Sequence, residues 1–138
     1  MTPDQARATL ESVLTAALTN TGLPLSFTND LSTTPNTTFG RIIMLHTDAR
    51  QRSWTGAECH WENIGRVVVE VSVPPGEGVR PAYQRLATIK ASLAGKKFGM
   101  DRLRIGAATV RDIGTNDKTG WWAVQVSFPF VYDDDSIP

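Results

Sequence analysis

The segment Trp121–Tyr132 constrains the fold more than any other part of the chain, because its side chains alternate in two sets. One set is wholly apolar or aromatic and contains Trp122, Val124, Val126, Phe128, Phe130 and Tyr132. Successive side chains of a β-strand point to opposite faces, so this alternation predicts a long strand with one buried face. A small domain whose best-defined element is such a scaffold strand is better suited to assembly than to catalysis.

Length and composition place the chain among ordinary globular proteins. It has 138 residues, 41% hydrophobic and 20% charged, enough for one domain with a hydrophobic core. Fourteen basic and fourteen acidic residues cancel, which argues against strong general affinity for nucleic acid. No apolar run is long enough to span a membrane, and the N-terminus lacks the pattern of a secretory signal. The single cysteine cannot form an internal disulfide, which fits a reducing cytosol. We predict a single α+β domain over residues 1–132 and an acidic C-terminal tail over 133–138.

Two helices are predicted from capping and periodicity. Thr2-Pro3-Asp4-Gln5 has the form of a capping box and precedes apolar residues at helical spacing, which indicates a helix over Pro3–Leu18, with Gly22 as a C-terminal cap. The break at 74–78 precedes a second apolar stripe, which indicates a helix over Arg80–Leu93 that ends before Gly95.

Strands are predicted at 41–47, 66–73 and 103–111 besides the last one, and a short extended segment at 25–27. Polar loops are predicted at 28–38, 48–65 and 112–120. Part of the second loop, about Ser53–Trp61, is a candidate further strand. The fold class is therefore α+β, mainly antiparallel β-sheet with two α-helices packed on one face. An error of one residue in the choice of face would exchange the buried and the exposed side chains of a strand. The predicted core contains Leu10, Leu14, Leu18, Ile43, Leu45, Val69, Val71, Leu86, Ile89, Val124 and Val126.

The motifs that could carry chemistry are incomplete. Gly76 and Gly78 lie between a strand and a helix, but neither a Walker loop nor a dinucleotide fingerprint follows. Cys59 and His60 are neighbours on a candidate strand, where they would point to opposite faces, and no Cys or His cluster has zinc-ligand spacing. We predict that the chain is not an enzyme and has no catalytic residue, no cofactor and no metal site.

Candidate interface residues are aromatic or charged. Trp121 and Trp122 should face opposite sides of their strand, so one of them lies against a loop or a partner. Basic residues in the 48–65 segment could pair with acidic groups of a neighbour, and the acidic tail is one such group. The predicted oligomer or partner interface contains Arg50, Arg52, Trp54, Trp61, Trp121, Asp133 and Asp134.

The order of these elements resembles the tail terminator (tail completion) proteins of long-tailed bacteriophages. The resemblance covers nearly the whole chain. It rests on the N-terminal helix, the strand entering V-V-V-E-V-S-V-P-P-G-E-G, the helix Y-Q-R-L-A-T-I-K, the turn Lys96-Lys97-Phe98, and the aromatic strand that ends in F-P-F-V-Y-D. These are patterns of composition and order, and no family residue is matched closely enough to be carried over as a functional site.

The resemblance implies a structural virion protein of the phage tail. Such proteins form a ring, typically a hexamer, that caps the last ring of the major tail tube protein, stops polymerisation and provides the head-joining surface. The implied partners are the chain itself, the tube protein and the head–tail connector proteins. No membrane or sequence-specific nucleic acid is implied. The implied location is the head-proximal end of the virion tail, after assembly in the host cytoplasm.

Three alternatives are left open by the residues. The nearest is a head–tail connector or neck (head completion) protein. The second is a small ligand-binding domain that uses the Gly76–Gly78 turn and Arg80. The third is a nucleic-acid-binding module that uses Arg50, Arg52, Lys96, Lys97 and Arg102.

Overall fold

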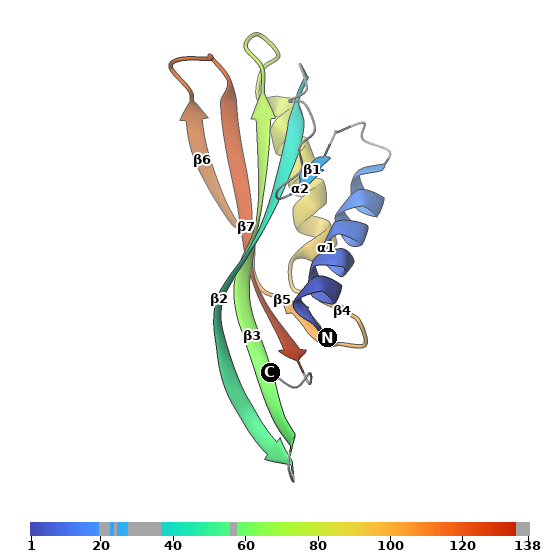
Figure 1. Ribbon diagram of the computed structural model, residues 1–138. Helices are drawn as coiled ribbons and strands as arrows, with labels where there is room; N and C mark the ends of the chain where they lie inside the picture. Colours follow the sequence, from blue (N-terminus) through green and yellow to red (C-terminus); the bar gives the residue numbers. More distant parts are fainter. Residues whose placement is uncertain (20–22, 24, 28–36, 56–57, 135–138) are drawn as a thin grey trace.

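The computed structural model describes residues 1–19, 23, 25–27, 37–55 and 58–134. The elements are α1 (Pro3–Leu18), β1 (Leu25–Phe27), β2 (Phe39–Thr55), β3 (Glu58–Val73), α2 (Arg80–Leu93), β4 (Lys97–Phe98), β5 (Leu103–Ile105), β6 (Thr109–Thr115) and β7 (Trp122–Asp134). The strands form one sheet in the order β1-β2-β3-β7-β5-β4, and β6 also pairs with β7. Both helices lie on the same side of the sheet (Figure 1). The predicted α+β class is confirmed.

All pairings are antiparallel except that between β1 and β2. The last strand, β7, lies inside the sheet: it pairs with β3 along one edge and with β5 and β6 along the other. β5 pairs with the C-terminal part of β7 and β6 with its N-terminal part, so these two strands lie end to end.

Both helices begin and end where the sequence predicts. The Thr2 hydroxyl accepts a hydrogen bond from the Gln5 N–H at 3.2 Å, and the Gln5 side chain accepts one from the Thr2 N–H at 2.9 Å. This capping box satisfies two N–H groups that a helix leaves unpaired at its start. Each helix buries four residues at helical spacing against the sheet: Ala6, Leu10, Leu14 and Leu18 in α1, and Ala82, Leu86, Ile89 and Leu93 in α2. Gly22 lies outside the described residues.

The sheet face under the helices holds the core, and the predicted face of one strand is wrong. Ile42, Val69 and Val126 are paired neighbours and buried on the helix side. Ile43 is only half-buried and Leu45 is 51% exposed, so these two predicted core residues lie on the other face. The sequence R-I-I-M-L-H-T is apolar in both alternating sets, so alternation alone could not choose between them. The rest of the predicted core is confirmed.

The segment 48–65 is not a loop. Strands β2 and β3 run through it and stay paired up to Thr55 and Glu58, with two register irregularities, between His46 and Asp48 and between Gln51 and Ser53. The pairing of β3 with β7 ends at Trp61 and Asp134. The two strands therefore continue alone as a hairpin past the end of β7, at the bottom of Figure 1. We call residues 51–55 and 58–61 the arm.

The predicted strand at 103–111 is interrupted at 106–108, and Pro129 of β7 explains the break. The Pro129 carbonyl accepts a hydrogen bond from the Gly106 N–H at 2.8 Å, so the backbone of Pro129 faces this neighbour. Proline has no N–H to return the bond, so the ladder cannot continue there. A side chain at position 106 would also lie 2.7 Å from the Pro129 ring, which a glycine avoids.

Candidate assembly surfaces

A row of charged side chains crosses the sheet at its lower end. Arg50 of β2 donates two hydrogen bonds to Glu62 of β3, at 2.9 and 2.6 Å. Arg104 of β5 holds Asp133 of β7 through two contacts at 3.2 and 3.3 Å and lies 3.5 Å from Glu62. The hydrogen bond with Asp133 is the main cause that raises the pKa of Arg104. We call Arg50, Glu62, Arg104 and Asp133 the charge row.

The charge row neutralises carboxylates that would otherwise repel each other. Glu62 and Asp133 lie directly opposite each other on β3 and β7, and Glu62 is only 7% exposed. Like charges at opposed strand positions destabilise a sheet, and a buried carboxylate needs a partner. Arg104 contacts both groups, and Arg50 adds a second partner for Glu62. Sequence reasoning missed Glu62, because its place inside the sheet depends on the long β2–β3 pairing.

Two predicted interface residues therefore have partners within the chain. Arg50 binds Glu62, and Arg104 binds Asp133. The Asp133 carbonyl also accepts a hydrogen bond from the ammonium of Met1 at 3.1 Å. Asp133 and Asp134 belong to β7, so the domain extends at least to Asp134 and not only to residue 132. The prediction of a solvated tail that begins at Asp133 is wrong.

The neighbouring tryptophans contact opposite sides of the sheet. Trp122 packs against the core, and its ring contacts the ring of Tyr83 of α2 in a tilted arrangement with 5.6 Å between the centroids. Trp121 makes an edge contact with Phe39 of β2 at 5.7 Å on the other side. Trp121 is half-buried, so this contact covers it only in part.

The structure describes only some of the predicted aromatic and basic side chains of the arm. Trp61 is half-buried on β3, and its indole N–H is buried without a hydrogen-bond acceptor among the described residues. The side chains of Arg52 and Trp54, like those of Cys59 and His60, lie outside the described part of the structure. Where the structure describes side chains, no group of three or more His, Cys, Asp or Glu could hold a metal ion. None of the described helices has the length and hydropathy needed to cross a membrane.

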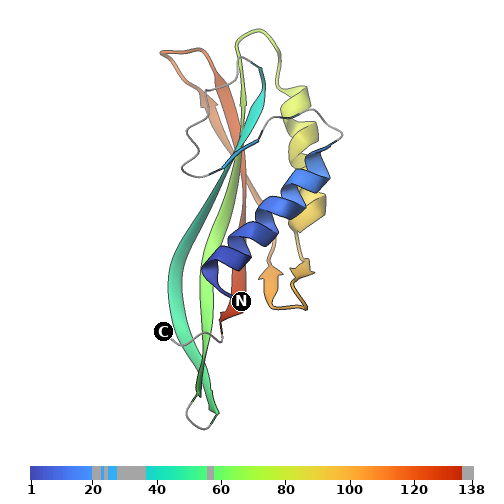
Figure 2. The same cartoon turned by 45° about the vertical axis from the view of Figure 1, so that its right-hand side comes forward.

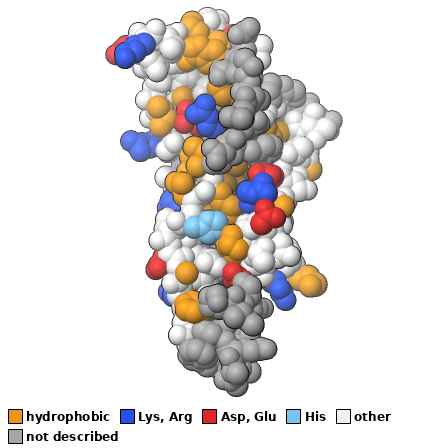
Figure 3. Space-filling view, viewed as in Figure 1, with side chains coloured by type: hydrophobic (Ala, Val, Ile, Leu, Met, Phe, Trp, Pro, Cys, Tyr) orange, Lys and Arg blue, Asp and Glu red, His pale blue; other side chains and the backbone are white. Residues whose placement is uncertain are grey.

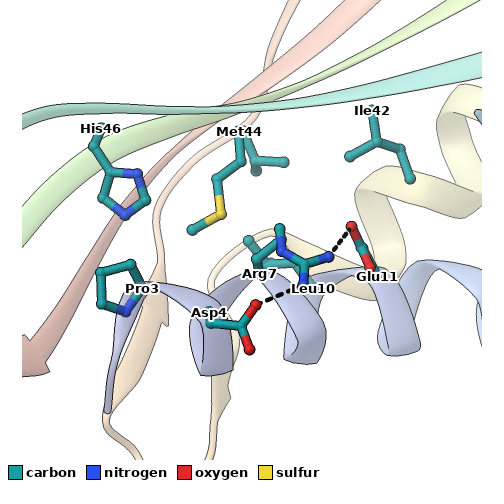
Figure 4. A pocket seen from close by; sticks show the side chains of 9 residues that line it. Pro3, Asp4, Arg7, Leu10, Glu11, Ile42, Met44 and His46 are labelled. Atoms are coloured by element: carbon teal, nitrogen blue, oxygen red, sulfur yellow. Dashed lines mark hydrogen bonds and ion pairs between the residues drawn. The ribbon is translucent and has the colours of Figure 1, made fainter. Parts of the chain in front are cut away.

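A pocket of about 400 Å³ lies between the start of α1 and strand β2, and we call it the α1 pocket. Its floor is apolar, formed by Leu10, Ile42, Met44 and Val67, and its rim carries Pro3, Asp4, Arg7, Glu11 and His46 (Figure 4). Arg7 is bound to Asp4 at 2.6 Å and to Glu11 at 2.8 Å, and the Asp4 bond is the main cause that raises its pKa. The rim therefore presents both charge signs around an apolar floor.

The far end of the α1 pocket is held by a hydrogen bond between two strands. The His46 ring nitrogen Nε2 lies 2.7 Å from the Tyr132 hydroxyl, and both rings contact Phe130. Burial of the hydroxyl, with a smaller contribution from Asp134, raises the pKa of Tyr132 to about 12. Tyr132 is thus a neutral donor or acceptor at any ordinary pH.

The β4–β5 turn (Gly99–Arg102) exposes an apolar side chain that sequence reasoning missed. Met100 is 90% exposed, far more than the other exposed large hydrophobic residues of the described chain. Met100 and Asp101 both have positive φ, 56° and 65°, and the Arg102 N–H donates to the Gly99 carbonyl at 3.3 Å. This is the geometry of a type I′ turn, in which glycine and asparagine are favoured. No pattern in the sequence marks Met100, because methionine usually fills cores.

Besides the outer edges of the short end strands β1 and β4, two longer strand edges have no partner strand among the described residues. β1 pairs with β2 only at Gly40, Arg41 and Ile42, which leaves the outer edge of β2 open from Ile43 onwards. β6 pairs only with β7, and nearly all of its residues are exposed. Open edges offer N–H and C=O groups to another chain, and natural proteins usually cover them.

Comparison with known proteins supports the fold alone. No protein-family model and no curated protein matches the chain. One solved structure is similar over 100% of this chain and 99% of its own length, with a TM-score of 0.70 and 23% sequence identity. At this identity the likeness shows that a chain of the same size adopts the same α+β architecture, without bearing on function.

Proposed function

We propose that this chain is a structural subunit of a phage tail, and that it closes into a ring on the end of the tail tube. The ring stops polymerisation of the tube and provides the surface to which the head is joined. The observation that carries this proposal is the pair of open edges, β2 and β6, on the two sides of one sheet. A contact between two different surfaces of identical copies builds a ring when the rotation closes.

The arm supports the second part of the proposal, a contact with the tube. Its two strands extend beyond β7 and have no other strand beside them in the described structure. An isolated two-stranded hairpin is only marginally stable in water, so the arm gains stability from a partner. The exposed end of a tube, which is itself an unfinished assembly, is such a partner.

The experiment that tests the function is complementation of a phage from which the gene has been deleted. We expect overlong tails that are not joined to heads in electron micrographs, and normal tails once the intact gene is supplied. Normal virions from the deletion would remove the proposal. Tails of normal length beside unjoined heads would instead favour the connector or neck role.

A shortened arm separates fold from function. Residues 52–60 are replaced by Asn-Gly, which favours a two-residue hairpin turn and here joins the paired residues Gln51 and Trp61. We expect the monomer to keep its melting temperature and the phage to show the deletion phenotype. The double variant Arg50→Glu and Arg52→Glu is a poorer test, because it also places a carboxylate opposite the buried Glu62.

We also propose that the chain catalyses no reaction and needs no cofactor or metal. The variants Cys59→Ser and His60→Ala should then support normal tails. Loss of infectivity with an unchanged melting temperature would reveal a chemical role.

A further inference from the structure

The β4–β5 turn holds its exposed methionine at an energetic cost. A residue with a Cβ is disfavoured at positive φ, and Met100 and Asp101 both adopt it, in sequence. The turn is nevertheless held in place by two hydrogen bonds to the residues that follow Met100. The Arg102 carbonyl accepts from the Asp133 N–H at 3.2 Å, and the Arg104 guanidinium donates to the Asp101 carbonyl at 3.3 Å. Backbone strain that the surrounding structure maintains is characteristic of functional positions.

The α1 pocket is a matching receptor for such a side chain. Its floor is apolar and partly open, and Figure 3 shows apolar side chains exposed between the histidine and the charged side chains of α1. Methionine is unbranched and flexible, so it fills irregular apolar pockets well. A pocket of about 400 Å³ has room for one such side chain and the base of its turn.

The charges around the two features are complementary. Asp101 and Arg102 flank Met100, both are exposed, and their side chains form no ion pair with the described residues. The rim of the α1 pocket carries Arg7 between Asp4 and Glu11. With charges of both signs on the turn and on the rim, Asp101 of one copy can lie near Arg7 of another while Arg102 lies near a carboxylate.

The turn and the pocket lie on opposite flanks of the same helix. Figures 1 and 2 both show β2 on one side of the first turns of α1 and the β4–β5 turn on the other. The turn is near the chain start, since a Cβ at Gly99 would meet the end of the Met1 side chain at 2.6 Å. A copy therefore cannot insert its own Met100 into its own pocket, so a Met100 that enters the pocket must belong to another copy.

We propose that Met100 of one copy docks into the α1 pocket of the next copy, and that this contact repeats around the ring. The inference rests on the proposed function only in so far as that function requires copies to associate head to tail. It adds the specific contact that sets the order of neighbours, because the turn and the pocket are different surfaces.

Disulfide trapping tests the contact directly. In a Cys59→Ser background, one preparation carries Met100→Cys and a second, enlarged by a fused tag, carries Met44→Cys. After mild oxidation of the mixture at high protein concentration, we expect a disulfide-linked dimer of unequal subunits on non-reducing gels. A chain with both cysteines should give a ladder of oligomers. The matched control, Val79→Cys mixed with Met44→Cys, should give no such dimer, because Val79 is exposed to 41% elsewhere.

A second measurement separates docking from folding. Met100→Gly removes the side chain and also the backbone strain of a non-glycine residue at positive φ, so the melting temperature should not fall. The concentration at half-assembly, followed by sedimentation, should rise roughly tenfold or more, as loss of a buried methionine predicts. Met100→Leu, which keeps the apolar volume, should retain most of the assembly, and Val79→Gly should assemble as the parent does.

Three results would overturn the docking contact. They are a mixed disulfide no more abundant than in the Val79 control, unchanged assembly of Met100→Gly, and a parent chain that stays monomeric at its highest soluble concentration. Each of them leaves the tail-length assay unaffected, so failure of this contact is distinguishable from failure of the proposed function.

Discussion

A methyl group added at Gly65 should damage the fold more than its size suggests. An ideal Cβ at this position would lie 2.1 Å from the Leu45 carbonyl oxygen and 2.4 Å from the ring of Phe130. Gly65 pairs with His46 on β2 and with Phe130 on β7, so the Phe130 ring covers the glycine and touches the His46 ring. The ring could rotate to some extent, but a backbone carbonyl in a strand ladder cannot move without disturbing its pairing.

We therefore expect Gly65→Ala to lower the free energy of unfolding by about 2–2.6 kcal/mol. Overpacking a core typically costs about 1–3 kcal/mol, and the backbone clash places this site at the top of that range. The more restricted unfolded chain offsets only about 0.4–1 kcal/mol. For a chain of this length, the melting temperature should fall by about 10 °C.

Gly40→Ala is the matched control, since Gly40 lies in the neighbouring strand β2. Its added Cβ would meet the ends of the Leu25 and Leu23 side chains at 3.0 and 3.4 Å, and the Glu70 carbonyl oxygen only at an ordinary contact distance of 3.9 Å. These ends can rotate away, so the change should stay within about 1 kcal/mol. Urea unfolding of both variants and the parent measures the difference. Equal stabilities of the two variants would refute the argument from the carbonyl contact.

Two further predictions concern the core. Leu86→Ala, at a position 4% exposed, should lower the free energy of unfolding by about 2–5 kcal/mol in urea titrations, and a loss below 1 kcal/mol would mean that α2 is loosely packed. The raised pKa of Tyr132, about 12, means that the fold favours the neutral phenol. Its contribution to stability is complete below the unfolded pKa of about 10 and is lost as the pH rises from there towards 12. Tyr132→Phe should weaken this alkaline loss, and phenolate absorbance should show one tyrosine ionising near 12.

Sequence patterns were most informative where one interpretation satisfied several local rules. The capping box at Thr2 and the glycine at 95 fixed the helix ends, because caps are determined by nearby residues. Ile43 and Leu45 are predicted on the wrong face, because both alternating sets of side chains in that strand are apolar. Only the position of α1 determines which set is buried. The break at 106–108 was missed because its cause, Pro129, is distant in sequence.

The assembly surfaces were predictable only as residue types. Arg50, Trp61 and Asp133 were recognised as unusual, but their environments come from pairings over long sequence separations. Met100 has no signal of its own, because its exposure follows from a turn conformation that its residue type disfavours. The α1 pocket joins residues from α1 and β2, whose relative placement no local pattern encodes.

The central position of β7 has a consequence for synthesis. A ribosome makes this strand after all the other described elements, yet its apolar residues complete the core between β3 and the strands beyond. Before it emerges, the nascent chain has an unpaired apolar edge on β3 and no partner for the Met1 ammonium, which binds the Asp133 carbonyl. Such a chain exposes apolar surface and strand edges, which makes it a substrate for chaperones and not a native domain. A chain that ends before β7 lacks the strand that completes the core, so we expect it not to reach the native fold.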